Sequence, residues 1–202
     1  MNMLTREAER VLASLSSLVF LPMGDLMKFS RLLVATSFCT FLALGAVARA
    51  ETKVEVKGVH ICCGACVSAA NKILKGVDGA KGVVDRKAKS ITITAPDDAT
   101  AQKALDALAA GGFHGDTGNK DLTFKDDSGA SAGKVKKVTV SGIHNCCGAC
   151  TAGIKAAVKK VDGATGSTVK PKAETFDVTG DFDATDLVKT LNKAGFHVKV
   201  EK

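Results

Sequence analysis

Residues 59–66, Val59-His60-Ile61-Cys62-Cys63-Gly64-Ala65-Cys66, return later in the chain as IHNCCGAC at residues 143–150. Two shorter blocks recur in the same order, VDGA at 77–80 and 161–164 and GFH at 112–114 and 195–197. Matched blocks in a fixed order indicate a duplicated domain of about 70 residues. The Cys-rich segment is therefore the fixed point from which each repeat can be read outward.

The residue periodicities around each Cys cluster predict one short series of elements. Alternating residues before the cluster predict a strand, and the apolar residues after it predict a helix that stops at the Asp-Gly turn. Two short strands, a second helix and a last strand follow. The expected ranges are strands 54–56 and 138–140, helices 65–74 and 149–161, the later of the two short strands at 90–94 and 175–178, helices 100–110 and 184–194 with Asp183 as a cap, and a final strand at 196–200.

This order, strand–helix–strand–strand–helix–strand, is that of a ferredoxin-like unit. The sequence therefore predicts an α+β protein with two ferredoxin-like βαββαβ domains in tandem. The last strand of the first repeat is unclear, because residues 115–119 (GDTGN) interrupt it before residues 122–124.

The N-terminal region has the pattern of a secretory signal. A positively charged stretch at 27–31 precedes a mostly apolar run at 32–47, and Ala48-Arg49-Ala50 fits a small-x-small cleavage site. The run is shorter than the ~18 residues that a membrane span needs. We therefore expect cleavage after Ala50, with Met27 as the true start, and a mature protein that is periplasmic or extracellular.

These patterns predict four segments of the chain. Residues 1–50 are the leader and signal peptide, and residues 51–125 are the first domain. Residues 126–134, rich in Asp, Ser, Gly and Ala, are expected to be a flexible linker. Residues 135–202 are the second domain.

Composition limits the function classes. The chain has 202 residues, is 46% apolar and contains no Trp or Tyr, which suits two small domains better than one large domain. The formal net charge is +7, but the Lys residues are scattered among acidic residues. Binding to nucleic acid requires a clustered basic patch, so no nucleic-acid partner is expected. No serine, paired-carboxylate or phosphate-loop arrangement indicates catalysis.

Six cysteines lie outside the predicted signal, and all of them fall in the two repeated clusters. Each cluster occupies the junction of a strand and a helix, where free backbone N–H groups and the helix dipole favour thiolate over thiol. Cys63 is expected on the loop and Cys66 in the first helical turn, and Cys147 and Cys150 match them. Two thiolates on an open loop select soft ions such as Cu(I) or Hg(II), and one such pair cannot complete the tetrahedron of structural zinc.

A strand, Cys-x-x-Cys, a helix, a Val-x-Gly turn and a late Gly-Phe together resemble the heavy-metal-associated domain family. This family includes copper chaperones, the metal domains of copper-transporting ATPases and the periplasmic mercury-binding protein. The resemblance covers residues 52–124 and 134–202. It implies that the metal ligands are Cys63 and Cys66 in the first repeat and Cys147 and Cys150 in the second, and that a shielding loop aromatic falls on Phe113 and Phe196.

The chain departs from the family pattern around the clusters. The usual Gly-Met before the motif is replaced by His60-Ile61 and by His144-Asn145, which is expected to weaken the hydrophobic support under the metal loop. Cys62 and Cys146 add a third sulfur to each cluster. Each is either an inert residue that faces away or an accessory ligand of a trigonal site.

The four histidines also fall in matched positions. His60 corresponds to His144, and His114 corresponds to His197. One interpretation makes all four loop histidines. The other makes His114 and His197 accessory ligands that approach the metal from the last loop, since imidazole also binds copper and zinc.

The sequence thus predicts an exported, non-enzymatic carrier of soft heavy-metal ions. Cu(I) is the expected ion, with Hg(II) and Zn(II) as alternatives, and a membrane metal transporter or another metal-binding protein is the expected partner. A thiol–disulfide oxidoreductase that uses Cys-Gly-Ala-Cys is the alternative from another class. Against it, the repeats are too short for a thioredoxin fold. Structural disulfides are a third interpretation, but three sulfurs per domain would leave one unpaired.

Overall fold

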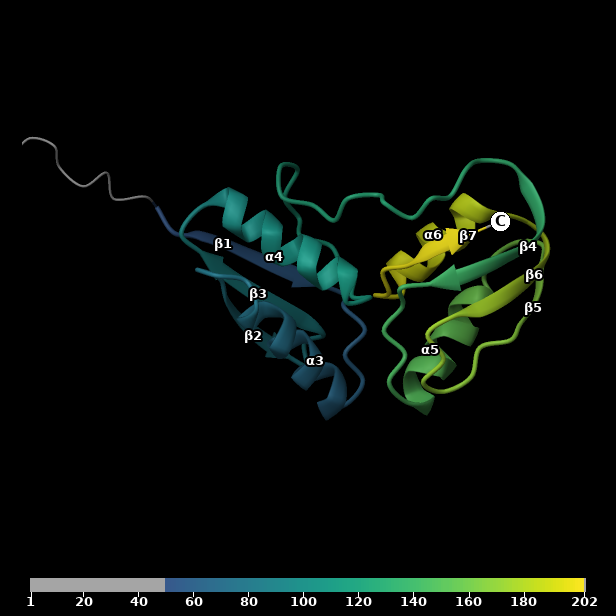
Figure 1. Cartoon of the computed structure of the whole chain (residues 1–202), viewed down its shortest axis with the longest axis horizontal. Coiled ribbons are helices and arrows are strands. Elements are labelled where there is room, and N and C mark those ends of the chain that lie inside the picture. The colour runs from purple at the N-terminus through teal and green to yellow at the C-terminus, as the bar shows by residue number, and fades with distance from the viewer. Residues whose placement is uncertain (1–49, 202) are drawn as a thin grey trace, which may run out of the picture. The chain divides into compact units, whose positions relative to one another are not determined.

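The two repeats fold as two α+β units with the predicted order of elements. The computed structural model describes residues 50–201. The predicted leader, the start at Met27 and the signal residues before Ala50 lie outside that range. The prediction of two ferredoxin-like units in tandem is confirmed (Figure 1).

The first repeat contains three strands and two helices. They are β1 (Thr52–Lys57), α3 (Gly64–Lys75), β2 (Lys81–Asp85), β3 (Ser90–Ala95) and α4 (Asp98–Ala110). The antiparallel sheet has the order β1-β3-β2, with α3 packed against β2 and α4 against β1 and β3. Val54 pairs with Ile93 and Val56 with Ile91, so the alternation places all four apolar side chains in the core.

The interrupted end of the first repeat does not form a full strand. A single bridge joins Asp116 to Lys57 at the free edge of β1, with N–H···O distances of 2.7 and 2.8 Å between the two backbones. Leu122 is nevertheless buried, which anchors the segment that follows. The GDTGN insertion thus leaves a three-stranded sheet with one bridge in place of a fourth strand.

The second repeat completes its four-stranded sheet. Its elements are β4 (Lys134–Ser141), α5 (Gly148–Val158), β5 (Ala164–Ser167), β6 (Phe176–Asp183), α6 (Ala184–Lys193) and β7 (Lys199–Glu201). The strand order is β5-β6-β4-β7. Asp183 caps α6 as predicted, because its carboxylate accepts a 2.8 Å hydrogen bond from the Thr185 backbone N–H.

The final strand is shorter than the predicted range 196–200. β7 begins only at Lys199, because the backbones of Phe196 and His197 pair with the first repeat and not with β4. Phe196 forms an isolated antiparallel bridge with Phe113 of the first repeat. The His197 N–H donates a 3.1 Å hydrogen bond to the Gly112 carbonyl, also in the first repeat.

One hydrophobic cluster runs through both repeats, and both belong to one compact unit of the chain. Phe113 and Phe196 are among its largest buried side chains. In the segment expected to be a flexible linker, Ser128 is buried and its carbonyl accepts a 2.8 Å hydrogen bond from the Val200 N–H. This hydrogen bond holds the predicted linker against the last strand of the second repeat.

Candidate metal centre

Each Cys cluster lies on the loop between the first strand and first helix of its repeat. Cys63 is the N-cap residue of α3 and Cys147 is that of α5, and both have extended backbones. Neither thiol side chain caps the helix in the manner of Ser or Asp. The first-turn N–H groups are therefore available to a thiolate.

The three sulfurs of each repeat lie close together. All six cysteines are free thiols. The Sγ–Sγ distances are 3.6 Å for Cys62–Cys66 and 3.7 Å for Cys63–Cys66, and 3.7 Å for Cys146–Cys150 and 4.0 Å for Cys147–Cys150. Cys62 and Cys146 therefore do not face away from their clusters, because the loop backbone does not follow strand alternation.

The two clusters also meet each other. Cys62 Sγ lies 3.6 Å from Cys147 Sγ and 3.5 Å from Cys150 Sγ. The sulfur of Cys146 is in turn 3.7 Å from that of Cys63 and 3.5 Å from that of Cys66, and Cys66 and Cys150 are 3.9 Å apart. The sequence predicted one site in each domain, whereas the fold gathers all six sulfurs at one place.

The local environment divides these thiols into two kinds. A backbone hydrogen bond from Cys66 lowers the pKa of Cys63, and one from Cys150 lowers the pKa of Cys147. Burial, together with hydrogen bonds to neighbouring sulfurs, raises the pKa of Cys62 and of Cys146. A soft metal ion would displace the protons of this second pair on binding, because the thiolate is the ligand.

His60 and His144 lie at the boundary between the repeats. The His60 ring stacks on Phe196 with centroids 4.2 Å apart, and the His144 ring stacks on Phe113 with centroids 4.4 Å apart. Each histidine thus packs on the loop aromatic of the other repeat. The Nε2 atoms of both histidines are buried and have no hydrogen-bond partner.

A ring nitrogen of His60 lies within 4.8 Å of the sulfurs of Cys62 and Cys150. Burial lowers the pKa of His60, and the charge of Lys89 adds to this effect. A neutral imidazole with an unpartnered nitrogen can bind a metal or donate to a thiolate. His60 was not predicted to be a ligand, although its position two residues before Cys62, matched by His144 before Cys146, was the available signal.

The structure brings His114 and His197 to each other. Their Nδ1 atoms are 3.2 Å apart, and His197 Nε2 lies 2.6 Å from Asp127 Oδ1. Burial and the nearby His197 lower the pKa of His114 to about 4. Among the described residues, neither histidine belongs to a group of three mutually close candidate ligands. These two predicted accessory ligands therefore form a contact between the repeats that is separate from the Cys clusters.

The Gly-Phe-His loops cross at the boundary through two glycines with positive φ. Gly112 has φ +80° and Gly195 has φ +90°, in the region that favours glycine. A Cβ on Gly112 would lie 2.1 Å from the backbone nitrogen of His144, and a Cβ on Gly195 would lie 2.3 Å from that of His60. Glycine at these positions lets each loop approach the metal loop of the other repeat.

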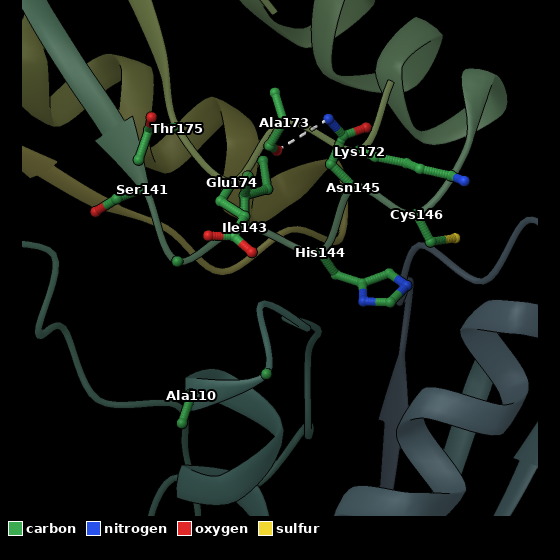
Figure 2. A pocket seen from close by; sticks show the side chains of 12 residues that line it. Ala110, Ser141, Ile143, His144, Asn145, Cys146, Lys172, Ala173, Glu174 and Thr175 are labelled. Atoms are coloured by element: carbon green, nitrogen blue, oxygen red, sulfur yellow. Dashed lines mark hydrogen bonds between the residues drawn. The ribbon is translucent and has the colours of Figure 1, made fainter. Parts of the chain in front are cut away.

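A pocket of about 720 Å³ opens beside the second cluster, with Cys146, His144, Asn145 and Lys172 in its lining. Figure 2 shows Asn145 turned toward Ala173, away from the pair formed by His144 and Cys146 along the loop. Its Nδ2 also donates a 2.7 Å hydrogen bond to the Lys170 carbonyl.

The hydrogen bonds of Asn145 compensate for the missing Met, whose replacement was expected to weaken the hydrophobic support under the metal loop. In the second repeat, hydrogen bonds of Asn145 hold the loop at the position of the usual Met. In the first repeat, Ile61 occupies the equivalent position and is buried. The hydrophobic support predicted to be weak is thus retained by Ile61 and replaced by polar contacts at Asn145.

Residues 137–197 match the family model of the heavy-metal-associated domain, which confirms the resemblance drawn from the sequence for the second repeat. No curated protein matches the chain. In the described part of the chain, no helix is both long enough and apolar enough to cross a membrane.

Three solved structures are similar to parts of the chain. A copper-binding domain from HMA7, a P-type ATPase, is 24% identical, covers 34% of this chain and 96% of its own, and has a TM-score of 0.32. Oxidized MerP from Ralstonia metallidurans CH34 is 28% identical, with 33% and 97% coverage and a TM-score of 0.31. The N-terminal soluble domains of Bacillus subtilis CopA are 16% identical, with 76% and 95% coverage and a TM-score of 0.28.

Proposed function

We propose that this protein, in which a heavy-metal-associated domain follows a related repeat, is an exported carrier of soft heavy-metal ions. Cu(I) is the ion that we propose first, with Hg(II) and Zn(II) as alternatives. The observation that carries the proposal is the convergence of six free thiols at the N-termini of α3 and α5.

The donor set supports a soft ion. Thiolate ligands favour Cu(I), zinc and iron–sulfur clusters over hard cations. The groups of mutually close candidate ligands in the described residues each hold three atoms, whereas structural zinc takes four ligands in a tetrahedron. Trigonal groups of sulfur therefore favour Cu(I) within this set.

The site also supports transfer of the ion to a partner. Cys63 and Cys147 are partly exposed, and the pocket beside Cys146 leaves space for an incoming ligand. A thiolate of the partner can then form a bond to the metal as one sulfur of this chain releases it, and neither step changes an oxidation state. We propose a membrane metal transporter or another metal-binding protein as that partner.

Export rests on the N-terminal pattern, and we propose that the mature chain begins at Glu51 outside the cytoplasm. A reaction with turnover is not part of the proposal, because every low-pKa thiol here lies against other sulfurs that complete a metal site. N-terminal sequencing of secreted material tests export. A mature chain that still carries residues 32–47 would contradict it.

Metal binding is tested on reduced protein purified without oxygen. Titration with Cu(I) against a competing chelator, followed by metal analysis, should give at least one tightly bound ion per chain. A variant with all six cysteines replaced by Ser is the control and should bind none. Fewer than one soft ion per chain in the unaltered protein would overturn the proposed function, and reduction of insulin with a defined dithiol potential would favour the oxidoreductase instead.

A further inference from the structure

We infer that the six cysteines form one shared thiolate cage that holds a cluster of four Cu(I) ions, in place of two separate single-ion sites. This inference rests on the proposed function and adds the number of ions and the way in which they are held. It requires the two repeats to act together.

The six sulfurs are arranged as the corners of an octahedron. They form three opposite pairs, which are Cys62 with Cys146, Cys63 with Cys150, and Cys66 with Cys147. Every sulfur lies within 4.8 Å of all the others except its opposite. Nine of these sulfur pairs are contacts of 4.0 Å or less. Among the described residues, neither relation joins the members of an opposite pair. Both repeats contribute to every opposite pair.

Four alternate faces of this octahedron supply four trigonal sites. Three faces have all of their sulfurs within 4.8 Å of one another. The fourth is formed by Cys62, Cys66 and Cys150, with distances of 3.6, 3.5 and 3.9 Å. The other three are Cys62–Cys63–Cys147, Cys63–Cys66–Cys146 and Cys146–Cys147–Cys150. Each cysteine belongs to two of the four faces, so each thiolate would bridge two ions.

The spacing suits trigonal coordination. With a metal–sulfur bond of ~2.3 Å, the three sulfurs of a planar trigonal site lie about 4.0 Å apart. The sulfur contacts between the repeats are 3.5 to 3.9 Å. Binding four Cu(I) ions therefore requires only small outward shifts at these contacts, and the cage edges without such a contact are within 4.8 Å.

The charge of such a cluster also fits its surroundings. Six thiolates and four Cu(I) ions leave two negative charges at the cage. The N-termini of α3 and α5 both meet it and favour negative charge. The buried, unpartnered Nε2 atoms of His60 and His144 lie on the same loops, and His60 is within 4.8 Å of two cage sulfurs.

Packing between the repeats holds the two halves of the cage in register. The Phe113–Phe196 bridge, the His60–Phe196 stack and the His144–Phe113 stack all join the repeats near the metal loops. The Gly195 carbonyl accepts hydrogen bonds from the N–H groups of His60 and His114, at 3.3 and 3.2 Å. The cage is thus formed within one chain and does not require a second copy.

The test is titration of the reduced protein with Cu(I), followed by native mass spectrometry and X-ray absorption. We expect four Cu(I) ions on a monomeric chain, three sulfurs per copper and a copper–copper scattering shell. Two ions per chain with two sulfurs each and no copper–copper shell would overturn the cage and leave the proposed function intact. Four ions found only in a dimer would also overturn it, whereas fewer than one ion would overturn the proposed function itself.

One pair of substitutions separates the cage from two independent sites. Each of the four faces contains one member of the pair Cys62 and Cys146, so Cys62→Ser with Cys146→Ser leaves no face complete. We expect at most two Cu(I) per chain in this variant and loss of the copper–copper shell. The control is Ala65→Ser with Ala149→Ser, which places hydroxyls on the same loops and should keep four ions. Four ions in the cysteine double variant would overturn the inference.

Discussion

The sulfur of Cys62 lies 3.5 Å from the sulfur of Cys150, although 88 residues separate them in the chain. One belongs to the loop before α3 and the other to the first turn of α5. Cys66 and Cys146 are likewise 3.5 Å apart across the same boundary. Among the described residues, the closest sulfur contacts are therefore between the repeats, and this determines how the thiols should react.

Mild oxidation of the metal-free protein should form disulfides between the repeats. Thiols this close exchange readily once one of them is oxidised. We expect digestion and mass spectrometry to recover a peptide with a first-repeat cysteine joined to one with a second-repeat cysteine. Protein loaded with Cu(I) is the control and should resist the reaction. Disulfides confined to Cys63–Cys66 and Cys147–Cys150 would contradict the shared arrangement.

Replacing Phe196 should destabilise the fold strongly. Phe196 is 1% exposed, and it packs both in the core and on His60 of the other repeat. Phe196→Ala should cost about 3–5 kcal/mol of unfolding free energy, as truncation of buried aromatic residues does. Val83, which is 69% exposed, gives the control, and Val83→Ala should change stability by less than ~0.5 kcal/mol. Denaturant unfolding followed by circular dichroism measures both, and equal effects would show that Phe196 is not a core residue.

Gly195→Ala should destabilise the boundary between the repeats by more than the cost of placing Ala at a positive φ. Gly195 and Gly118 both have positive φ, +90° and +61°. A Cβ at Gly118 meets no atom within 4 Å, whereas one at Gly195 would lie 2.3 Å from the His60 backbone nitrogen. The strained backbone costs about 1–3 kcal/mol at either site.

The difference between these two glycine variants therefore isolates the steric clash. We expect Gly195→Ala to be the less stable variant in denaturant unfolding and to bind fewer Cu(I) ions per chain than Gly118→Ala. Equal stability and equal copper binding in the two variants would argue against the close approach of the loops.

The Asp183 cap should make stability depend on pH in the acid range. Hydrogen bonds from the Thr185 side chain, and from the Gly133 and Thr185 backbones, lower the pKa of Asp183 to about 2. Because the folded pKa is below the ordinary value of 3.8, the stabilisation is present above that value and is lost as pH falls toward 2. Asp183→Asn keeps a capping oxygen but does not titrate. Denaturation between pH 2 and 5 should show a smaller pH dependence in the variant, and identical profiles would contradict the assignment.

Local patterns in the sequence were sufficient to predict most of the fold. The repeated blocks, the alternation of Val54 and Val56, and the Asp183 cap all follow from residues close together in the chain. Apolar residues alternate in a strand and recur every three to four residues in a helix. The change between these two periods predicted that the cysteines lie where a strand ends and a helix begins. The number of repeats and the residue types at the site were determined at this level.

The tertiary structure alone decided how the repeats meet. Nothing in the local pattern distinguishes a strand residue from one whose backbone pairs with another repeat, so Phe196 and His197 were assigned to the final strand. In the folded chain Phe196 bridges to Phe113 and His197 contacts His114, whereas His60 lies within 4.8 Å of two sulfurs. Whether the clusters stay apart or merge depends on complementary packing between surfaces distant in sequence, which only the folded chain brings together.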